Sequence, residues 1–381
     1  MPHSDFVRQL NDVQGVGRQS SWLLRWHIDP ILALCLFLLS TAGLFVLYSA
    51  TSKDMDTVVR QSVYLVIGFV AMFAVAQVSP RILMIWARWL YLASVLLLIV
   101  VLVLGIESKG AQRWIQLPGF RFQPSELAKL MMPIVVASYL ARRSLPPSLK
   151  DVCIVFLMVG GPVLLIAIQP DLGTSLLIAA SGLFVLLLSG LKWRWILSVA
   201  VLAVPSVYVL WHFFMYDYQK QRVLTFLNPE SDPWGAGWNI IQSMIAIGSG
   251  GLYGKGWIMG TQSHLDFLPE SHTDFIIAVL SEEFGFTGCI VLLAMYALIL
   301  GRGIFIALHA QTLFGRLLAG SITLTFFVYV FVNIGMVSGV LPVVGVPLPL
   351  VSRGGTSIVT IMLGFGMLMS VHTERRFLGC M

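Results

Sequence analysis

Carboxylates stand at the starts of three long apolar runs in the sequence, where a charge is costly unless it faces a partner or a water-filled cavity. Glu126 ends the segment Gln123-Pro124-Ser125-Glu126, Asp171 follows Pro170, and Asp274 follows the polar segment 268–273. A carboxylate held in such a place can take a proton from a substrate or return one. Asp171 and Asp274 are therefore candidate acids or bases, and Glu126 is a candidate binding residue.

Six basic residues lie near the same ends of the apolar runs. They are Lys109, Arg113, Lys129, Lys220, Arg222 and Lys255. Lys129 lies one helical turn inside its run, so it needs an anion or a water-filled cavity. Trp114 follows Arg113, and tryptophan beside a cation is typical of a membrane interface. These cations could together bind an anionic headgroup, so the residues fit a lipid-linked phosphate substrate.

A simpler role is open to several of these polar residues, because Ser, Thr and Asp commonly cap helix N-termini. Ser125 and Asp171 can cap the runs that follow them. Thr273 can cap the run that begins at 274, which leaves Asp274 available for chemistry. The cap and the chemical role remain open alternatives for Asp171.

Two other patterns predict loops and no chemistry. Asp54-Met55-Asp56 matches a metal-binding motif of only three residues, which arises often by chance, and we expect a solvated loop. Five glycines between 248 and 256 lack the Lys-Ser/Thr ending of a phosphate-binding loop. We expect a flexible turn there, after an amphipathic segment at 237–247.

The elements that must position the candidate residues are membrane helices. Of the 381 residues, 57% are hydrophobic and 11% are charged, whereas soluble domains have about 25% charged residues. The apolar residues form ten runs of about 20 residues, the length that a helix needs to cross a bilayer. The runs are 31–50, 61–79, 84–105, 124–142, 151–168, 172–190, 194–213, 274–300, 316–339 and 355–372. We therefore expect an all-α polytopic membrane protein with about ten transmembrane helices.

The positions of lysine and arginine predict the orientation, because cytoplasmic loops are enriched in them. Most of the 24 lysines and arginines fall on the side of the bundle that holds both termini and the short connections. We expect a cytoplasmic segment at 1–30, a single transmembrane domain at 31–372 and a cytoplasmic tail at 373–381. The large loop at 214–273 and all the candidate site residues then lie on the outer face.

Several classes of protein are excluded by composition and spacing. A nucleic-acid-binding protein needs a basic face or helix, but the basic residues here are scattered one or two per loop. Cys35, Cys153 and Cys289 lie in predicted spans and Cys380 in the tail, so their spacing fits neither a disulfide framework nor a zinc site.

Long motifs in the chain resemble the SEDS (shape, elongation, division, sporulation) family. The segments that carry the resemblance are 109–114, 123–126, 169–175, 268–275 and 333–357, the last with Gly345-Val346-Pro347-Leu348-Pro349-Leu350-Val351-Ser352. Details at 232–237 and 342–345 are more similar to the RodA branch than to the FtsW branch. The resemblance covers nearly the whole chain.

The resemblance implies a peptidoglycan glycosyltransferase that polymerises lipid II during cell elongation, on the outer face of the bacterial inner (plasma) membrane. In the implied reaction a sugar C4 hydroxyl of one lipid II attacks C1 of the MurNAc of another, with inversion, and undecaprenyl diphosphate leaves. Asp274 matches the family's essential aspartate and is the implied general base. Cations or a divalent metal would stabilise the leaving group. Implied partners are lipid II, a class B penicillin-binding protein and other membrane proteins of the elongation complex.

Two further functions would use the same features of the sequence. A lipid II flippase would need the outer cations and a cavity among the spans, but no chemistry at Asp274. A non-catalytic scaffold for cell-wall synthases would need neither the cations nor Asp274.

One residue departs from the family pattern. Arg353 stands where the Ser-x-Gly-Gly motif usually has Tyr or a small residue. It precedes the last predicted span, and a cation at a helix N-terminus opposes the helix dipole by about 0.3–1 kcal/mol. We expect Arg353 to pair with Asp171, Glu126 or Asp274, to contact the substrate diphosphate, or to face solvent.

Overall fold

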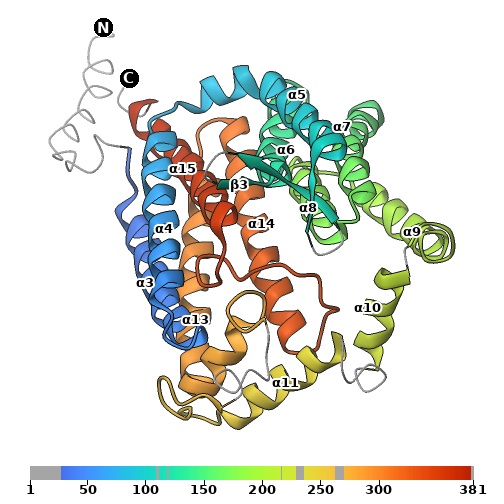
Figure 1. Ribbon diagram of the computed structural model, residues 1–381. Helices are drawn as coiled ribbons and strands as arrows, with labels where there is room; N and C mark the ends of the chain where they lie inside the picture. The colour runs from blue at the N-terminus through green and yellow to red at the C-terminus, as the bar shows by residue number, and fades with distance from the viewer. Residues whose placement is uncertain are drawn as a thin grey trace, which may run out of the picture.

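The computed structural model describes residues 27–108, 111–117, 120–215, 217–228, 236–261 and 270–378. A helix occupies each of the ten ranges predicted as spans (Figure 1). They are α3 (Pro30–Ala50), α4 (Met55–Ala76), α5 (Pro80–Leu104), α6 (Pro124–Leu140), α7 (Leu149–Ile168), α8 (Leu172–Leu188), α9 (Trp193–Val209, continued by the π-helical turn Leu210–Phe214), α13 (Ile276–Leu308), α14 (Leu313–Val337) and α15 (Gly355–Leu378). Within the described residues, seven of these helices are long and apolar enough to cross a membrane. The prediction of a helical, polytopic membrane protein is confirmed.

The start of α4 shows how a polar residue can extend a membrane helix beyond its apolar run. The Asp54 carboxylate accepts hydrogen bonds from the Asp56 N–H (3.0 Å) and from Thr57 Oγ1 (2.6 Å). An N-cap of this kind supplies an acceptor for the first-turn donors. The helix therefore begins at Met55: the segment is exposed to solvent as predicted, but Met55 and Asp56 lie in the first helical turn and not in a loop.

The helices divide into a central group and a lipid-facing group. In α14 and α15, 61% and 67% of the most apolar window is buried, whereas in α4 and α5 only 22% is buried. Nearly every residue of α6 is buried as well. Because an outer helix of a membrane bundle is solvated by lipid, α4 and α5 can expose apolar side chains there. Several polar residues of α6 and α14 are buried inside the bundle, among them Glu126, Lys129 and Asn333.

The connection between α5 and α6 contains a small antiparallel sheet. Its strands are β1 (Ile106–Ser108), β2 (Ala111–Leu117) and β3 (Phe120–Phe122), in the order β1-β2-β3. Ile106 pairs with Trp114 and Ile115 pairs with Phe122. β3 alternates apolar and polar residues, whereas β2 has the consecutive polar residues Gln112 and Arg113 followed by Trp114 and Ile115. The sheet carries Arg113 and Trp114.

The segment between α9 and α13 contains the helices α10 (Asp217–Leu227) and α11 (Ala236–Ser249) and then a glycine-rich loop. Four backbone hydrogen bonds of 3.0–3.1 Å join residues 251–256 of this loop to residues 282–287 of α13. α13 is broken at this point by Gly285, whose φ of 63° is open to glycine without strain. The loop is therefore bonded to the helix break, and the prediction of a flexible turn is wrong.

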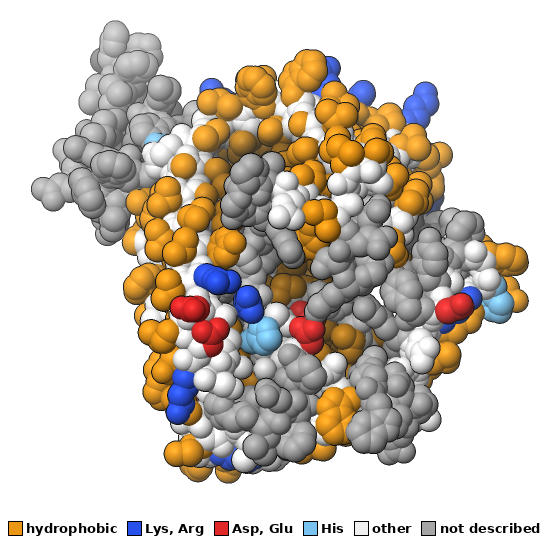
Figure 2. Space-filling view, viewed as in Figure 1, with side chains coloured by type: hydrophobic (Ala, Val, Ile, Leu, Met, Phe, Trp, Pro, Cys, Tyr) orange, Lys and Arg blue, Asp and Glu red, His pale blue; other side chains and the backbone are white. Residues whose placement is uncertain are grey.

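The first and last helices meet at one end of the bundle. The fully buried Asp29 carboxylate lies 2.9 Å from Arg302 Nε and 3.8 Å from His372 Nε2. The start of α3 and the last turns of α15 are thus neighbours, at the upper left of Figure 1. Figure 2 shows the molecule from the same side as Figure 1. Mainly apolar side chains cover the upper part of this face, and a band of acidic, basic and histidine side chains lies below its middle.

Candidate active site

A cavity of about 370 Å³ lies at the end of the bundle opposite the Asp29 cluster. The first turns of α6, α8 and α15 form it together with β2 and the loop at 344–347. Its polar and charged lining residues include Arg113, Trp114, Gln123, Glu126, Lys129, Asp171, Thr174, Thr273, Tyr329, Arg353, Thr356 and Ser357. The size suits a small-molecule site, since such pockets usually have about 300–1,000 Å³.

One ion pair of the cavity wall lies within α6. Lys129 Nζ is 2.6 Å from Glu126 Oε1, and the two residues are only 7% and 6% exposed. Pro124 fixes the start of the helix, so that Glu126 is in the first turn and Lys129 lies one turn further in. The spacing of three residues puts both on one helix face. Each charge compensates the other in a place where an isolated charge would be costly.

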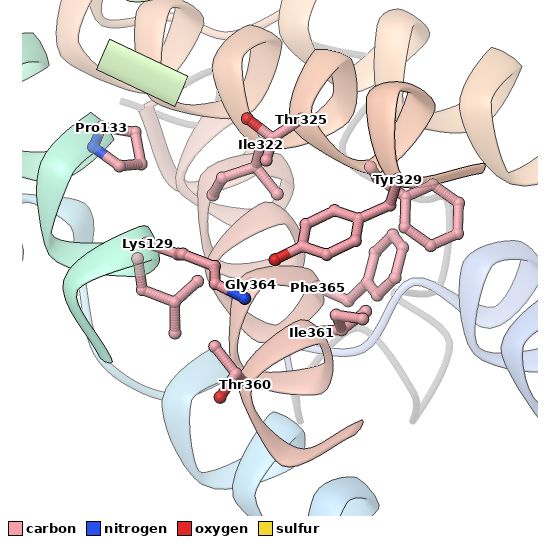
Figure 3. A pocket seen from close by; sticks show the side chains of 11 residues that line it. Lys129, Pro133, Ile322, Thr325, Tyr329, Thr360, Ile361, Gly364 and Phe365 are labelled. Atoms are coloured by element: carbon pink, nitrogen blue, oxygen red, sulfur yellow. The ribbon is translucent and has the colours of Figure 1, made fainter. Parts of the chain in front are cut away.

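Tyr329 of α14 completes the surroundings of this pair. The Lys129 ammonium is 5.2 Å from the centre of the Tyr329 ring. Figure 3 shows the lysine nitrogen and the tyrosine hydroxyl turned toward one another, where Phe365 and Thr360 of α15 also line a smaller, largely apolar pocket. Tyr329 therefore links α14 to the charged pair of α6.

A second ion pair joins the sheet to the start of α8. Arg113 Nε lies 3.3 Å from Asp171 Oδ2, and Arg113 Nη2 donates to the Pro170 carbonyl at 3.3 Å. Asp171 is also the N-cap of α8, because it accepts from the Thr174 N–H and hydroxyl. The cap that we considered for Asp171 is confirmed, and the same carboxylate also neutralises Arg113. Arg113 and Asp171 thus lie in the same cavity as the α6 pair.

Asp274 lies directly beside the cavity, next to the lining residue Thr273. Asn333 of α14 fixes its backbone, because Asn333 Nδ2 donates to the Asp274 carbonyl (2.9 Å) and to the Val346 carbonyl (2.7 Å). Gly345 has a φ of +77°, and a Cβ added there would lie 3.5 Å from Asp274 Oδ2. The carboxylate therefore lies against the loop that forms one wall.

The other predicted cations lie elsewhere or outside the described residues. Lys255 Nζ contacts Glu282 Oε1 at 2.7 Å and Thr261 Oγ1 at 2.9 Å, on the glycine-rich loop away from the cavity lining. Lys220 is on α10 and is also outside that lining. Arg222 is on the same helix, but its side chain is not among those described, and Lys109 lies outside the described residues. Arg113 and Lys129 are the predicted binding cations that the structure places in the cavity wall.

Two of the proposed helix caps are absent from the structure. Gln123 is the N-cap residue of α6 and Ser125 lies inside the first turn, without a capping hydrogen bond from Gln123. Thr273 donates to Glu270 Oε2 at 2.7 Å, and α13 begins after Phe275. Pro124 explains the first difference, because the fixed φ of proline favours the first helical position, so the helix begins at Pro124 and Ser125 falls inside its first turn.

Arg353 lines the cavity at its exposed side. Two of the carboxylates suggested for it, Asp171 and Glu126, are paired with Arg113 and Lys129 instead. The Arg353 N–H donates to the His272 carbonyl at 3.0 Å. This bond joins the loop before α15 to the segment that carries Asp274.

Tyr329 and Asn333 were not among the residues chosen from the sequence. Both are polar groups within an apolar run, and they are four residues apart, so they share one face of α14. A polar residue inside a membrane span usually marks a cavity or a partner. Their spacing was therefore a usable signal, which the search for charged residues overlooked.

The described residues do not form a metal cage from protein ligands alone. Among them, no three His, Cys, Asp or Glu side chains come close enough together to hold an ion. Glu126 and Asp171 in the cavity wall are each paired with a cation.

Comparison with known proteins gives matches over most of the chain. The sequence model of the FtsW, RodA and SpoVE family, described as cell cycle proteins, matches residues 29–377. The peptidoglycan glycosyltransferase MrdB of Escherichia coli (strain K12) is 54% identical over 352 residues, which cover 92% of this chain and 95% of MrdB. A probable peptidoglycan glycosyltransferase FtsW of Geobacter sp. (strain M18) is 38% identical over 360 residues, covering 91% of this chain and 97% of that protein.

Solved structures show the same architecture. A chain from a peptidoglycan synthase complex that coordinates polymerization and crosslinking has a TM-score of 0.79 and 36% identity, covering 91% of this chain and 98% of that one. The crystal structure of the rod shape determining protein RodA of Thermus thermophilus has a TM-score of 0.70 and 32% identity, covering 91% of this chain and 97% of that one.

Proposed function

The chain belongs to the FtsW, RodA and SpoVE family of cell cycle proteins, known as SEDS, and we propose that the cavity described above is its active site as a peptidoglycan glycosyltransferase. The activity follows from the identity to MrdB over nearly the whole length of both chains. The substrate that suits the cavity is lipid II, used during cell elongation.

The observation that carries this proposal is the gathering of a buried cation–carboxylate pair, a partly buried one and Asp274 around one cavity. Lys129 and Arg113 come from segments far apart in the sequence, and each is fixed by a carboxylate. Charged groups that are already oriented can stabilise a diphosphate without rearrangement during the reaction. Asp274 is close enough to the same cavity to act on a substrate bound there.

In the proposed reaction, the C4 hydroxyl oxygen of one lipid II forms a bond to C1 of the MurNAc of the other. The bond from C1 to the diphosphate oxygen breaks, the anomeric centre is inverted, and undecaprenyl diphosphate leaves with the bonding electrons. Asp274 takes the proton of the attacking hydroxyl. A carboxylate with an ordinary pKa of about 3.9 is a weak base, so this transfer accompanies the loss of the diphosphate.

Arg113 and Lys129 have the complementary role at the leaving group. Their charges are oriented by Asp171 and Glu126, and they stabilise the negative charge that develops on the diphosphate as the bond to C1 breaks. The buried position of Lys129 strengthens this interaction, because water screens it little.

The orientation proposed for the chain puts both termini in the cytoplasm and the cavity on the outer face, with about ten helices crossing the inner membrane. The predominance of lysine and arginine in the N-terminal segment, the short connections and the tail supports this orientation. The Asp29–Arg302–His372 cluster then lies at the cytoplasmic end and the cavity at the opposite end.

The partner proposed for the chain is a class B penicillin-binding protein with one membrane helix, within the complex that elongates the cell wall. The structural match to a chain of a peptidoglycan synthase complex supports a partner that crosslinks the strands. Co-purification from mildly solubilised membranes tests this association, and failure to recover any such protein would count against it.

Polymerisation of purified lipid II by the Asp274→Asn variant tests the proposed active site. Loss of a general base lowers the rate by about 10²–10⁴-fold, while the isosteric amide keeps the fold and the thermal unfolding temperature. Asp56→Asn, on the first turn of α4 outside the cavity, is the matched control and should polymerise at the normal rate. A folded Asp274→Asn protein that makes glycan strands normally would rule out the general base.

The same preparation separates the enzyme from a flippase or a scaffold. In proteoliposomes, a flippase moves labelled lipid II across the bilayer without making glycan strands, and Asp274→Asn leaves that movement unchanged. A scaffold does neither. Glycan strands made by the purified chain with its partner support the enzyme.

A further inference from the structure

Arg353 is the cation of the cavity wall whose charge is not balanced by a neighbouring wall residue. Three cations and two carboxylates line the cavity, and both carboxylates are taken up by ion pairs with Arg113 and Lys129. Within the described part of the chain, no ion pair shorter than 4 Å includes Arg353. The described lining side chains therefore include one more cation than carboxylates, and the cation without an ion pair among them is Arg353; the Asp274 carboxylate lies beside this lining.

The backbone on both sides of Arg353 is firmly held. Gln61 of α4 donates from Nε2 to the Ser352 carbonyl (3.0 Å) and accepts from the Gly354 N–H at Oε1 (3.3 Å). The Arg353 N–H itself donates to the His272 carbonyl. These bonds fix the base of the side chain relative to the Asp274 segment, while the side chain itself is exposed toward the cavity opening. Such an arrangement reduces the loss of freedom when a ligand binds.

The charge of Arg353 affects the pKa of Asp54, but the Asp54 carboxylate forms its hydrogen bonds with other groups. The hydrogen bond from Thr57 Oγ1 is the largest cause of the lowered pKa of Asp54, and the charge of Arg353 is the smallest. Asp54 is moreover occupied as the N-cap of α4. It influences Arg353 from a distance and leaves the guanidinium donors available to a ligand.

We propose that Arg353 is a substrate-binding residue that donates to a phosphate oxygen of the lipid-linked diphosphate, and that it sets how tightly this chain binds that anion. The proposal rests on the proposed function of the cavity. A guanidinium offers several donors in a plane that match phosphate oxygens. The cavity lies at the polar ends of the membrane helices, where the diphosphate lies when its lipid chain is in the hydrocarbon and its sugars are in water.

The proposal also explains why a cation is tolerated just before α15. The helix N-terminus is itself positive, so Arg353 is unfavourable there until an anion arrives. Where the family usually has Tyr or a small residue, the cavity lacks this third charge. A chain with Arg353 should therefore bind the diphosphate more tightly and lose affinity more steeply as salt increases.

Binding of inorganic diphosphate and the kinetics of lipid II polymerisation test the proposal, with the full-length chain and its partner in nanodiscs of neutral phosphatidylcholine. Arg353→Met and Arg353→Tyr should weaken diphosphate binding and raise KM for lipid II by about tenfold, while kcat changes less than about twofold. Arg353→Lys keeps the charge and loses the planar donors, so it should retain only part of the affinity. Lys53→Met, an exposed cation outside the cavity lining, is the matched control and should change neither quantity.

Four results would overturn the proposal. Unchanged diphosphate binding and KM in Arg353→Met mean that the side chain only faces solvent. A lowered unfolding temperature with normal binding means that it is a structural partner of Asp54. Weakened binding of a soluble stem pentapeptide, with normal diphosphate binding, means that its ligand is a carboxylate. An effect that appears only in phosphatidylglycerol nanodiscs means that it binds ordinary lipid headgroups.

The direct binding measurement separates this inference from the proposed function. If the wild-type chain makes no glycan strands, the proposed glycosyltransferase fails. Diphosphate binding that depends on Arg353 would then still support the anion site.

Discussion

The cavity has two walls that are built in different ways. The pair wall consists of Arg113 with Asp171 and Lys129 with Glu126, and its side chains hold one another through ion pairs. The loop wall consists of Asp274, the loop at 344–347 and Arg353, and hydrogen bonds to backbone atoms hold it in place. One wall is thus fixed by side-chain charges and the other by its backbone.

The two kinds of wall suit two different tasks within one site. Buried ion pairs resist change, because removing either partner leaves a charge without compensation. In a wall held by hydrogen bonds to its backbone, the side chains do not have to bind one another. The pair wall therefore suits the constant task of binding charge, and the loop wall can vary in sequence, as Arg353 illustrates, without loss of the fold.

The strongest way to break the pair wall is Lys129→Met. This change leaves the Glu126 charge buried without its partner, and we expect unfolding to become easier by about 3–5 kcal/mol, with loss of polymerisation. The double variant Lys129→Met with Glu126→Gln should recover most of the stability and none of the activity. Thermal unfolding and a lipid II assay check both, and equal stability of the single and double variants would contradict the buried pair.

The support behind the loop wall can be tested at the break in α13. A Cβ at Gly285 would lie 2.3 Å from the Gly254 nitrogen, and its φ is positive, so Gly285→Ala should destabilise the chain by about 2–4 kcal/mol. Polymerisation should fall because the half-helix that follows Asp274 moves. Gly301→Ala, which meets no atom within 4 Å, is the control. Similar unfolding temperatures for the two variants would show that the loop is not bonded to the break.

Asn333→Leu tests the bonds that place Asp274 in the loop wall. It removes the donor to the Asp274 and Val346 carbonyls, and a buried carbonyl without a partner costs about 1–3 kcal/mol. We expect a modest fall in stability and a larger fall in kcat than in lipid II affinity. Ser338→Ala, at the exposed end of α14, serves as the comparison. An unchanged kcat would mean that Asp274 is placed by other contacts.

Tyr329→Phe should have the smallest effect, and it tests whether the Tyr329 hydroxyl helps to orient Lys129 in the pair wall. It keeps the ring near Lys129 and removes only the hydroxyl, so stability should change by about 0.5–1.5 kcal/mol. Polymerisation should slow several-fold while the protein remains folded. Tyr253→Phe, which is exposed and outside the cavity, should have no effect on either quantity. A normal rate in Tyr329→Phe would show that the hydroxyl does not help to orient Lys129.

The positions of the helices followed from the sequence, because a membrane helix needs a run of apolar residues of a certain length. The apolar runs also showed which polar residues lie near their ends. One cavity is lined by four of these residues: Arg113, Glu126, Lys129 and Asp171. Which helices are neighbours did not follow, because hydrophobicity is similar on all of them.

Partners that depend on neighbouring helices were accordingly missed. Lys255 was expected to bind the substrate. In the structure it lies on the glycine-rich loop and contacts Glu282 of α13. The polar position of Tyr329 in an apolar run was visible in the sequence, but its contact with Lys129 depends on the position of α14 beside α6. Local composition predicted the elements, and tertiary packing decided which of their polar groups meet.

The Asp29 cluster has a consequence for the order in which the chain is assembled. Asp29 begins the first membrane helix, whereas its ion-pair partner Arg302 is made 273 residues later, and His372 near the end of the last helix. During synthesis the carboxylate therefore remains hydrated at the membrane surface until both later helices have inserted. The start of α3 reaches its final electrostatic surroundings only when translation is nearly complete, so a chain that stops before α13 lacks the cation that pairs with Asp29.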